Sequence, residues 1–95
     1  MSQIEFEWDE NKNQKNIAKH KVSFEEAKSA FYDPNALVIH DPRNSDDNED
    51  RFLLLGMSGN LKLLIVCHCY RANDEVIRII SARKADKNEE KAYGR

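Results

Sequence analysis

The sequence predicts a single α+β domain over residues 1–95, in which helices pack on one face of an antiparallel sheet. Its length of 95 residues suits one hydrophobic core. Leu, Ile, Val and Phe together number 22, enough for a folded chain, and 13 of them lie between residues 52 and 80. Helical patterns precede this apolar region and strand patterns fill it, which is typical of α+β proteins.

The N-terminal residues predict an extended segment followed by a polar helix. Ile4, Phe6 and Trp8 alternate with glutamates, as in a short strand or an extended lead-in. Asp9 is a typical N-cap, and the helix predicted after it spans residues 10–19. This helix is polar along nearly its whole length, so it needs tertiary contacts for stability.

A second helix is predicted to begin at Ser23. Glu26 lies three residues further on and completes the pattern of a capping box, in which each side chain accepts from the other residue's backbone N–H. The Asp33-Pro34 pair ends the helix, because a residue before proline disfavours helical backbone angles. The predicted buried stripe consists of Phe24, Ala27 and Phe31.

Strand patterns dominate the second half of the chain. Residues 36–40 form a candidate strand, and residues 41–50 predict an exposed acidic loop. Three strand patterns separated by short polar turns follow, which predicts an antiparallel meander with its longest strand at the centre and a sheet of about four strands. A last helix is predicted over residues 86–93. The three meander strands span residues 51–57, 61–71 and 75–83.

Charge and hydropathy exclude several classes of protein. The net charge of −2 argues against a non-specific nucleic-acid binder, although residues 11–21 contain four lysines and no acid. No apolar run approaches the length of about 18 residues that a membrane span needs, so we expect no membrane association. Acidic residues near the N-terminus, where a secretory signal is basic and then apolar, predict a cytoplasmic protein.

The Cys67-His68-Cys69 sequence is not typical of a metal or redox site. In a strand, Cys67 and Cys69 share one face at a separation near the upper limit for a disulfide, while His68 points to the other face. The sequence contains no second cluster of metal ligands. We therefore expect two small buried cysteines and no bound metal.

Ser81 and Arg83 are candidates for a phosphate site. Strand alternation places them on the same face as Ile77 and Ile79, at the margin of the sheet. A hydroxyl beside a guanidinium suits a bound phosphate, because arginine offers a planar fork of donors. The alternative is that both side chains only satisfy carbonyl groups at the end of a strand.

A histidine and further arginines are also candidates. His20 ends the first predicted helix between two lysines, and imidazole suits proton transfer near neutral pH. The alternative is a surface histidine that caps the helix. Arg51 and Arg71 are expected at one end of the meander and Arg83 at the other, so the pairing alone does not bring them together. The other histidines are expected to be structural: His40 and His68.

Several segments together resemble the BrnT family of toxins from bacterial type II toxin–antitoxin pairs. They occur in the family's order over nearly the whole chain, from about residue 6 to residue 93. The two longest of them are specific in combination. The segments are residues 6–9 (FEWD), residues 19–27 (KHKVSFEEA), Phe31, Asp33-Pro34, residues 49–52 (EDRF) and residues 77–85 (IRIISARKA).

This resemblance implies a RelE-like fold and an endoribonuclease that needs no metal ion or other cofactor. In such an enzyme the RNA 2′-hydroxyl attacks the adjacent phosphate, and the protein positions it, moves protons and stabilises charge. The resemblance implies that His20 transfers a proton or contacts the phosphate. It implies that Arg51 and Arg83 stabilise the phosphate and that Ser81 is an orienting hydroxyl. Residues implied more weakly, for RNA contact or stacking, are Lys19, Arg71, Arg78 and Tyr93.

The resemblance also implies a partner and shows one local difference. A small BrnA-type antitoxin with a ribbon–helix–helix domain would neutralise the toxin, which would contact DNA only through this antitoxin. RNA cleavage by the free toxin would inhibit translation. Family members commonly have glycine after the Lys-His pair, where a helix ends in a left-handed residue. The residue here is Lys21, which costs about 1 kcal/mol in that conformation.

Two hypotheses from different classes follow. The first is an endoribonuclease toxin bound by its antitoxin. The alternative is a non-catalytic protein-binding module on the same fold, whose arginines only bind a regulatory DNA-binding partner. The two differ in whether His20, Arg51 and Arg83 must line one groove.

Overall fold

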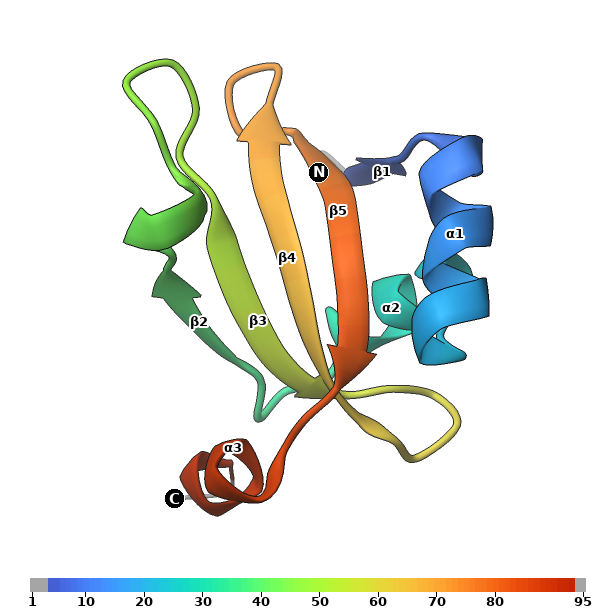
Figure 1. Ribbon diagram of the computed structural model, residues 1–95. Coiled ribbons are helices and arrows are strands. Elements are labelled where there is room, and N and C mark those ends of the chain that lie inside the picture. Colours follow the sequence, from blue (N-terminus) through green and yellow to red (C-terminus); the bar gives the residue numbers. More distant parts are fainter. Residues whose placement is uncertain (1–3, 94–95) are drawn as a thin grey trace.

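The computed structural model describes residues 4–93, which form a sheet with helices beside it (Figure 1). Its strands are β1 (Glu5–Glu7), β2 (Leu37–His40), β3 (Phe52–Met57), β4 (Leu63–Arg71) and β5 (Val76–Lys84). The strand order is β1-β5-β4-β3-β2, so the longest predicted strand lies at the centre, as expected. β2 to β5 pair antiparallel, whereas β1 pairs parallel with β5.

The sheet therefore differs from the predicted one of about four antiparallel strands. The extended lead-in becomes a fifth strand, because β1 lies in register with the start of β5, with Glu5 opposite Val76 and Glu7 opposite Arg78. The sheet is mixed, and a strand precedes the first helix. A strand of three residues is too short for alternation to predict the neighbour with which it pairs.

The helices occupy different places around this sheet. They are α1 (Glu10–His20), α2 (Phe24–Ala30) and α3 (Lys87–Ala92). α2 packs on one face, α1 lies along β5, and α3 lies beyond the end of β5, away from the other two (Figure 1). The expectation that the helices share one face is therefore wrong for α3. No helix in the described part of the chain is long and apolar enough to cross a membrane.

The caps of α1 define where this helix begins and ends. Asp9 is its N-cap, as predicted, and the side chain accepts from the Lys12 N–H at 3.1 Å. The helix ends at His20, one residue beyond the predicted end, and Lys21 is left-handed with φ 61°. The Lys21 N–H donates to the Ile17 carbonyl at 2.9 Å. A lysine thus takes the position that glycine favours, at a cost of about 1 kcal/mol.

The predicted capping box of α2 is only half formed. Ser23 Oγ accepts from the Glu26 N–H at 3.0 Å, as predicted. The other half of the prediction is wrong, because the Glu26 carboxylate accepts from Ser58 Oγ at 2.9 Å instead. A complete capping box is present at α3, between Asp86 and Glu89.

The core lies between α2 and one face of the sheet, which we call the helix face. Phe24 and Ala27 are fully buried there, as predicted. Phe31 was also expected to be buried but is only partly buried, and Ala30 is fully buried in its place. The core consists of Val22, Phe24, Ala27, Ala30, Leu54, Leu64, Val66, Ile77, Ile79 and Ala82.

The loop between β2 and β3 is acidic, as predicted, but is not wholly exposed. Asp41 is buried, and its N–H donates to the Arg51 carbonyl at 2.8 Å. Its carboxylate accepts from the Asn44 side chain at 2.7 Å, across a short 3₁₀ turn over Pro42–Asn44. These contacts hold the first half of the loop against the start of β3.

Candidate active site

A β-bulge in β5 determines which side chains point away from the core. Cys67 of β4 pairs with Ser81, but the next residue, His68, pairs with Ile79. Ile80 is therefore an extra residue without a partner in this register. Such a bulge reverses the alternation of side chains on either side of it.

The bulge overturns the predicted arrangement of the β5 side chains. Simple alternation placed Ser81 and Arg83 on the same face as Ile77 and Ile79. Instead, Ala82 joins Ile77 and Ile79 in the core. Ser81 and Arg83 lie on the opposite face, which we call the groove face.

A groove of about 490 Å³ lies on the groove face. All four residues predicted to be catalytic line it: His20, Arg51, Ser81 and Arg83. They come from the end of α1, the residue before β3, and the second half of β5. The groove is completed by Asp41, Arg43, Asn44, Leu53, Ile65, Cys67, Ile80 and Ala82.

His20 reaches this groove because the Asn16 side chain fixes the end of α1. β1 pairs with only the first three residues of β5, which leaves the strand edge at Ala82 without a neighbouring strand. Asn16 Nδ2 donates to the Ala82 carbonyl at 2.9 Å, and Asn16 Oδ1 accepts from the Ala82 N–H at 3.1 Å. Asn16 Nδ2 also donates to the Val22 carbonyl at 2.8 Å, just beyond the helix end. This amide thus takes the place of a strand partner and places the end of α1 beside β5.

Two of the three groove arginines, Arg51 and Arg83, are each held by a carboxylate. Arg51 Nε donates to Glu49 at 2.9 Å, and Arg83 makes a bidentate pair with Glu89 at 2.8 and 2.9 Å. These hydrogen bonds raise the pKa of both guanidiniums and lower the pKa of both carboxyl groups. The groove therefore presents two permanent positive charges whose orientation is set by neighbouring carboxylates.

The cysteines are buried and free, and they share the groove face as predicted. Cys67 lines the groove between Leu53 and Ser81, its register partners. Burial raises the pKa of its thiol, so the neutral, weakly nucleophilic form prevails near pH 7. His68 lies on the other face, against the Phe31 ring. Within residues 4–93, no group of three or more His, Cys, Asp or Glu side chains is arranged to hold a metal ion.

A basic surface continues from the groove along α1. Lys12, Lys15 and Lys19 line a neighbouring depression that shares His20 and Ser81 with the groove. Lys19 is therefore placed where a chain of phosphates leaving the groove can pass. This surface is therefore locally positive, although the net charge of the whole chain is negative.

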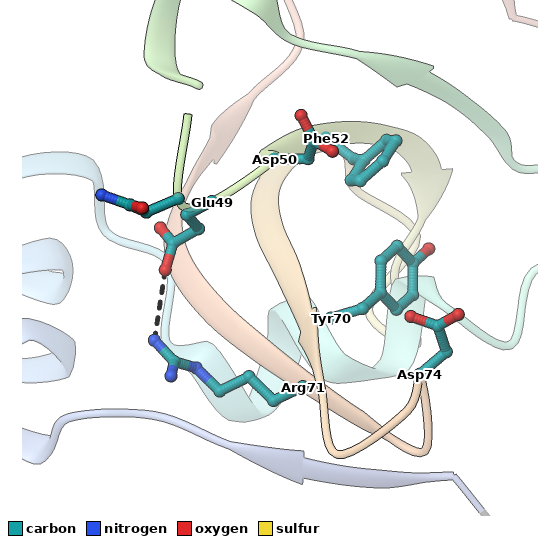
Figure 2. A pocket seen from close by; sticks show the side chains of 7 residues that line it. Glu49, Asp50, Phe52, Tyr70, Arg71 and Asp74 are labelled. Carbon is teal, nitrogen blue, oxygen red and sulfur yellow. Dashed lines mark hydrogen bonds and ion pairs between the residues drawn. The ribbon is translucent and has the colours of Figure 1, made fainter. Parts of the chain in front are cut away.

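The other three predicted RNA-contact residues do not line the groove. Arg71 pairs with Glu49 at 3.2 Å (Figure 2) and lies 3.7 Å from Glu7. Arg78 donates to Glu7 at 2.8 Å. The Tyr93 hydroxyl donates to the Asp33 carboxylate.

The groove also contains residues that sequence reasoning missed. Asp41, Arg43 and Asn44 belong to the loop that was expected to be exposed. The Asp-Pro pair that begins this loop is a turn signal and could have indicated ordered structure. Asn16, together with Asn13, is a buried polar residue on an otherwise exposed helix, but nothing in the sequence indicates which backbone groups they bind.

The chain was compared with known proteins. Residues 8–89 match the family model described as "Ribonuclease toxin, BrnT, of type II toxin-antitoxin system". The chain is also similar to the crystal structure of the Brucella abortus ribonuclease toxin, BrnT, with a TM-score of 0.63 and 26% sequence identity. That alignment covers 92% of this chain and 100% of the other. No curated protein gives a significant match.

Proposed function

The chain belongs to the BrnT family of ribonuclease toxins of type II toxin–antitoxin systems, and we propose that it cleaves RNA in the groove without a metal ion. The observation that carries this proposal is the presence of His20, Arg51, Ser81 and Arg83 in one groove. Membership of a ribonuclease family favours this function over a non-catalytic binding module. We also propose that the fold is RelE-like.

The proposed reaction is attack of an RNA 2′-oxygen on the adjacent phosphorus. The bond from phosphorus to the 5′-oxygen breaks, the 2′-proton leaves to a base, and the 5′-oxygen receives a proton. The products are a 2′,3′-cyclic phosphate and a 5′-hydroxyl. His20 is the proposed group for one of the two proton transfers, because imidazole can both accept and donate a proton near neutrality.

Arg51 and Arg83 are proposed to bind the phosphate while negative charge accumulates on it. Their guanidiniums are already charged and oriented, so they need little rearrangement during the reaction. An incoming phosphate must compete with Glu49 and Glu89 for these donors. Ser81 lies on the same strand as Arg83 and is proposed to orient the reacting phosphate or hydroxyl. Lys19 is proposed to contact the RNA backbone beside the groove.

The proposed cellular role is inhibition of translation in the cytoplasm, under the control of an antitoxin. We propose a BrnA-type ribbon–helix–helix antitoxin that neutralises the toxin in a stable complex. This complex should bind promoter DNA through the antitoxin alone, and the toxin by itself should not recognise that DNA. Gel-shift and RNA-cleavage assays on each chain and on the pair test this. Specific promoter binding by the isolated toxin contradicts it.

RNA cleavage with and without EDTA tests the metal-independent mechanism. Purified toxin free of antitoxin is incubated with single-stranded RNA, and the product ends are identified. We expect cleavage at an unchanged rate in EDTA, with 2′,3′-cyclic phosphate ends or their hydrolysis products. Loss of cleavage in EDTA that a divalent ion restores would overturn the mechanism, as would products with a free 3′-hydroxyl.

A further inference from the structure

An aromatic strip crosses the helix face beside α2, outside the proposed active site. Successive ring centroids lie 4.8 to 6.1 Å apart. Tyr32, at one end, is 69% exposed, and Tyr70 is 36% exposed. The strip runs through Tyr32, Phe6, Phe31, His68, Tyr70 and Phe52.

Four rings of the strip line an apolar groove of about 340 Å³: Tyr32, Phe6, Phe31 and Tyr70. Val38 lines this groove and is 48% exposed, and it belongs to β2, which forms an edge of the sheet. The next residue, Ile39, is 62% exposed. Ile39 pairs with Leu53 and lies on the groove face, so the exposed apolar side chains of this surface are Tyr32 and Val38, which mark an interaction surface more than a folding core.

An acidic pocket of about 520 Å³ continues the groove at Tyr70, which lines both. The rings of Phe52 and Tyr70 lie side by side, with the carboxylates of Asp50 and Asp74 beside them (Figure 2). Asp50 Oδ1 lies 3.2 Å from His40 Nε2, and both side chains are exposed. The Asp74 carboxylate has no ion pair with any residue between 4 and 93.

The two ends of this surface carry opposite charges. At the end away from the acidic pocket, Lys28 Nζ lies 5.4 Å from the centre of the Phe6 ring. At the other end, the pocket is lined by the Phe52 and Tyr70 rings, by three carboxylates and by Arg71, which pairs with one of these carboxylates, Glu49. A cationic side chain fits the second end, because carboxylates and aromatic faces both attract a cation.

We infer that this aromatic groove and its acidic pocket dock a segment of the antitoxin in which apolar side chains adjoin a lysine or arginine. The apolar side chains would lie along Tyr32 and Val38, and the cation would enter between Asp50 and Asp74. This inference rests on the antitoxin partnership proposed above. It adds the surface used and the chemistry of the segment that binds there.

Charge argues against RNA as the occupant. An RNA phosphate in the acidic pocket would meet three carboxylates, Glu49, Asp50 and Asp74, against one guanidinium, Arg71, which already pairs with Glu49 at 3.2 Å. A two-fold contact between copies of the chain can set the Lys28 end of one copy on the acidic end of the other, so the test below includes the oligomeric state. A partner segment with a positive charge matches the acidic pocket, and its apolar side chains match the groove.

The docking surface and the proposed active site share one loop but no predicted catalytic residue. Asn48, Glu49 and Asp50 line the acidic pocket. Asp41, Arg43 and Asn44, from the same loop, line the groove of the proposed active site. A docked segment would therefore sit beside the loop that completes the active site. Glu49 also holds Arg51, so it is substitution of Asp50, and not of Glu49, that should weaken antitoxin binding without changing RNA cleavage by the free toxin.

Removal of the two carboxylates tests the cationic end. The double variant Asp50→Asn, Asp74→Asn is compared with a control of equal charge, Asp47→Asn, Glu25→Gln, whose carboxylates are exposed outside the pocket and groove. Affinity of the purified full chain for the antitoxin encoded with it is measured by calorimetry at two salt concentrations. We expect the test variant to bind roughly tenfold more weakly and with less salt dependence, and the control to bind as wild type.

A second pair of variants tests the apolar end. Tyr32→Ala is compared with Leu61→Ala, which removes a side chain that is 84% exposed and lines neither the groove nor the pocket. We expect Tyr32→Ala alone to weaken antitoxin binding by roughly tenfold, because tyrosines that a partner buries at an interface are frequent hot spots. RNA cleavage by either free variant should equal that of wild type.

The possible results separate this surface from the partnership. Equal antitoxin affinity for the test and control variants overturns the docking surface and leaves the partnership intact. A wild-type chain that binds no co-encoded protein overturns the partnership and this inference with it. The third result is a concentration-dependent dimer of the wild-type chain that is absent in Tyr32→Ala. It assigns the surface to a second copy and also overturns the inference.

Discussion

The two faces of the sheet contain different kinds of side chain, and the same strands supply both. On the helix face, Leu64, Val66 and Ile79 are almost completely buried under α2. On the groove face, Arg51 and Arg83 are partly exposed, and each is held by a carboxylate. The comparison teaches that stability and proposed chemistry can be changed separately here, because alternate residues of one strand serve different faces.

The largest effect that this comparison predicts is on the stability of the helix face. Phe24 is fully buried, so Phe24→Ala should lower the free energy of unfolding by about 4 kcal/mol. Ile39→Ala, at a side chain that is 62% exposed, should cost less than about 1 kcal/mol. Urea unfolding measures both. Similar losses for the two variants would show that the groove face also contributes a core.

The next effect concerns the groove face and the rate of RNA cleavage. If Arg83 stabilises charge in the transition state, Arg83→Ala should lower the rate by roughly 100-fold with little change in stability. Arg83→Lys should recover only part of this, because an ammonium lacks the bidentate fork. Lys84→Ala, at the adjacent exposed residue, is the control and should keep nearly full activity. Full activity in a folded Arg83→Ala variant would exclude this residue from the site.

Local signals in the sequence were sufficient for most elements of the fold. Asp9 and Ser23 cap helices as predicted, since a cap depends only on residues within one turn. The meander was also predictable, because its strands are long and their turns are short. The parallel pairing of β1 was not, since three residues carry too little pattern to choose a partner.

The candidate site was predictable in its residue types but not in its geometry. The pairing of strands gave no reason to expect Arg51 and Arg83 in one groove, yet both line it. The bulge at Ile80 brings Arg83 to this face, and no glycine or proline in β5 marks it in the sequence. The role of Asn16 was equally hidden, because its partners at Ala82 are distant in the sequence.

A smaller effect, on both stability and rate, is expected at Asn16, which joins the two faces at the edge of β5. Asn16→Ala leaves buried backbone groups of Ala82 unpaired and should cost about 2 kcal/mol of stability. The cleavage rate should also fall under conditions where the variant is folded, and the NMR signals of the His20 ring should shift. The control Asn11→Ala, at an exposed position of α1, should change neither. A destabilised variant with unchanged His20 signals and rate would make Asn16 purely structural.

The smallest effect is a pH dependence of stability that originates on the helix face. His68 is fully buried among aromatic rings, and burial lowers the pKa of its imidazole below the ordinary value of 6.5, although a hydrogen bond with the Val66 carbonyl opposes this. As pH falls below about 6.5, the unfolded chain takes up a proton that the folded chain does not, so the folded state loses stability.

The loss attributable to His68 should not exceed about 1.4 kcal/mol per pH unit, and it should end once the folded imidazole also titrates. Carboxyl groups with a lowered pKa, such as Glu49 and Glu89, act in a separate window, because their stabilisation is lost only as pH falls toward and below 4.5. Urea unfolding between pH 7.5 and about pH 5.5 therefore separates the histidine contribution from that of these carboxyl groups, and variants identify the histidine responsible. His68→Gln should flatten the profile in this range, whereas His20→Gln, outside the core, should keep the decline. An unchanged slope in His68→Gln would show that the buried imidazole is not the source of the pH dependence.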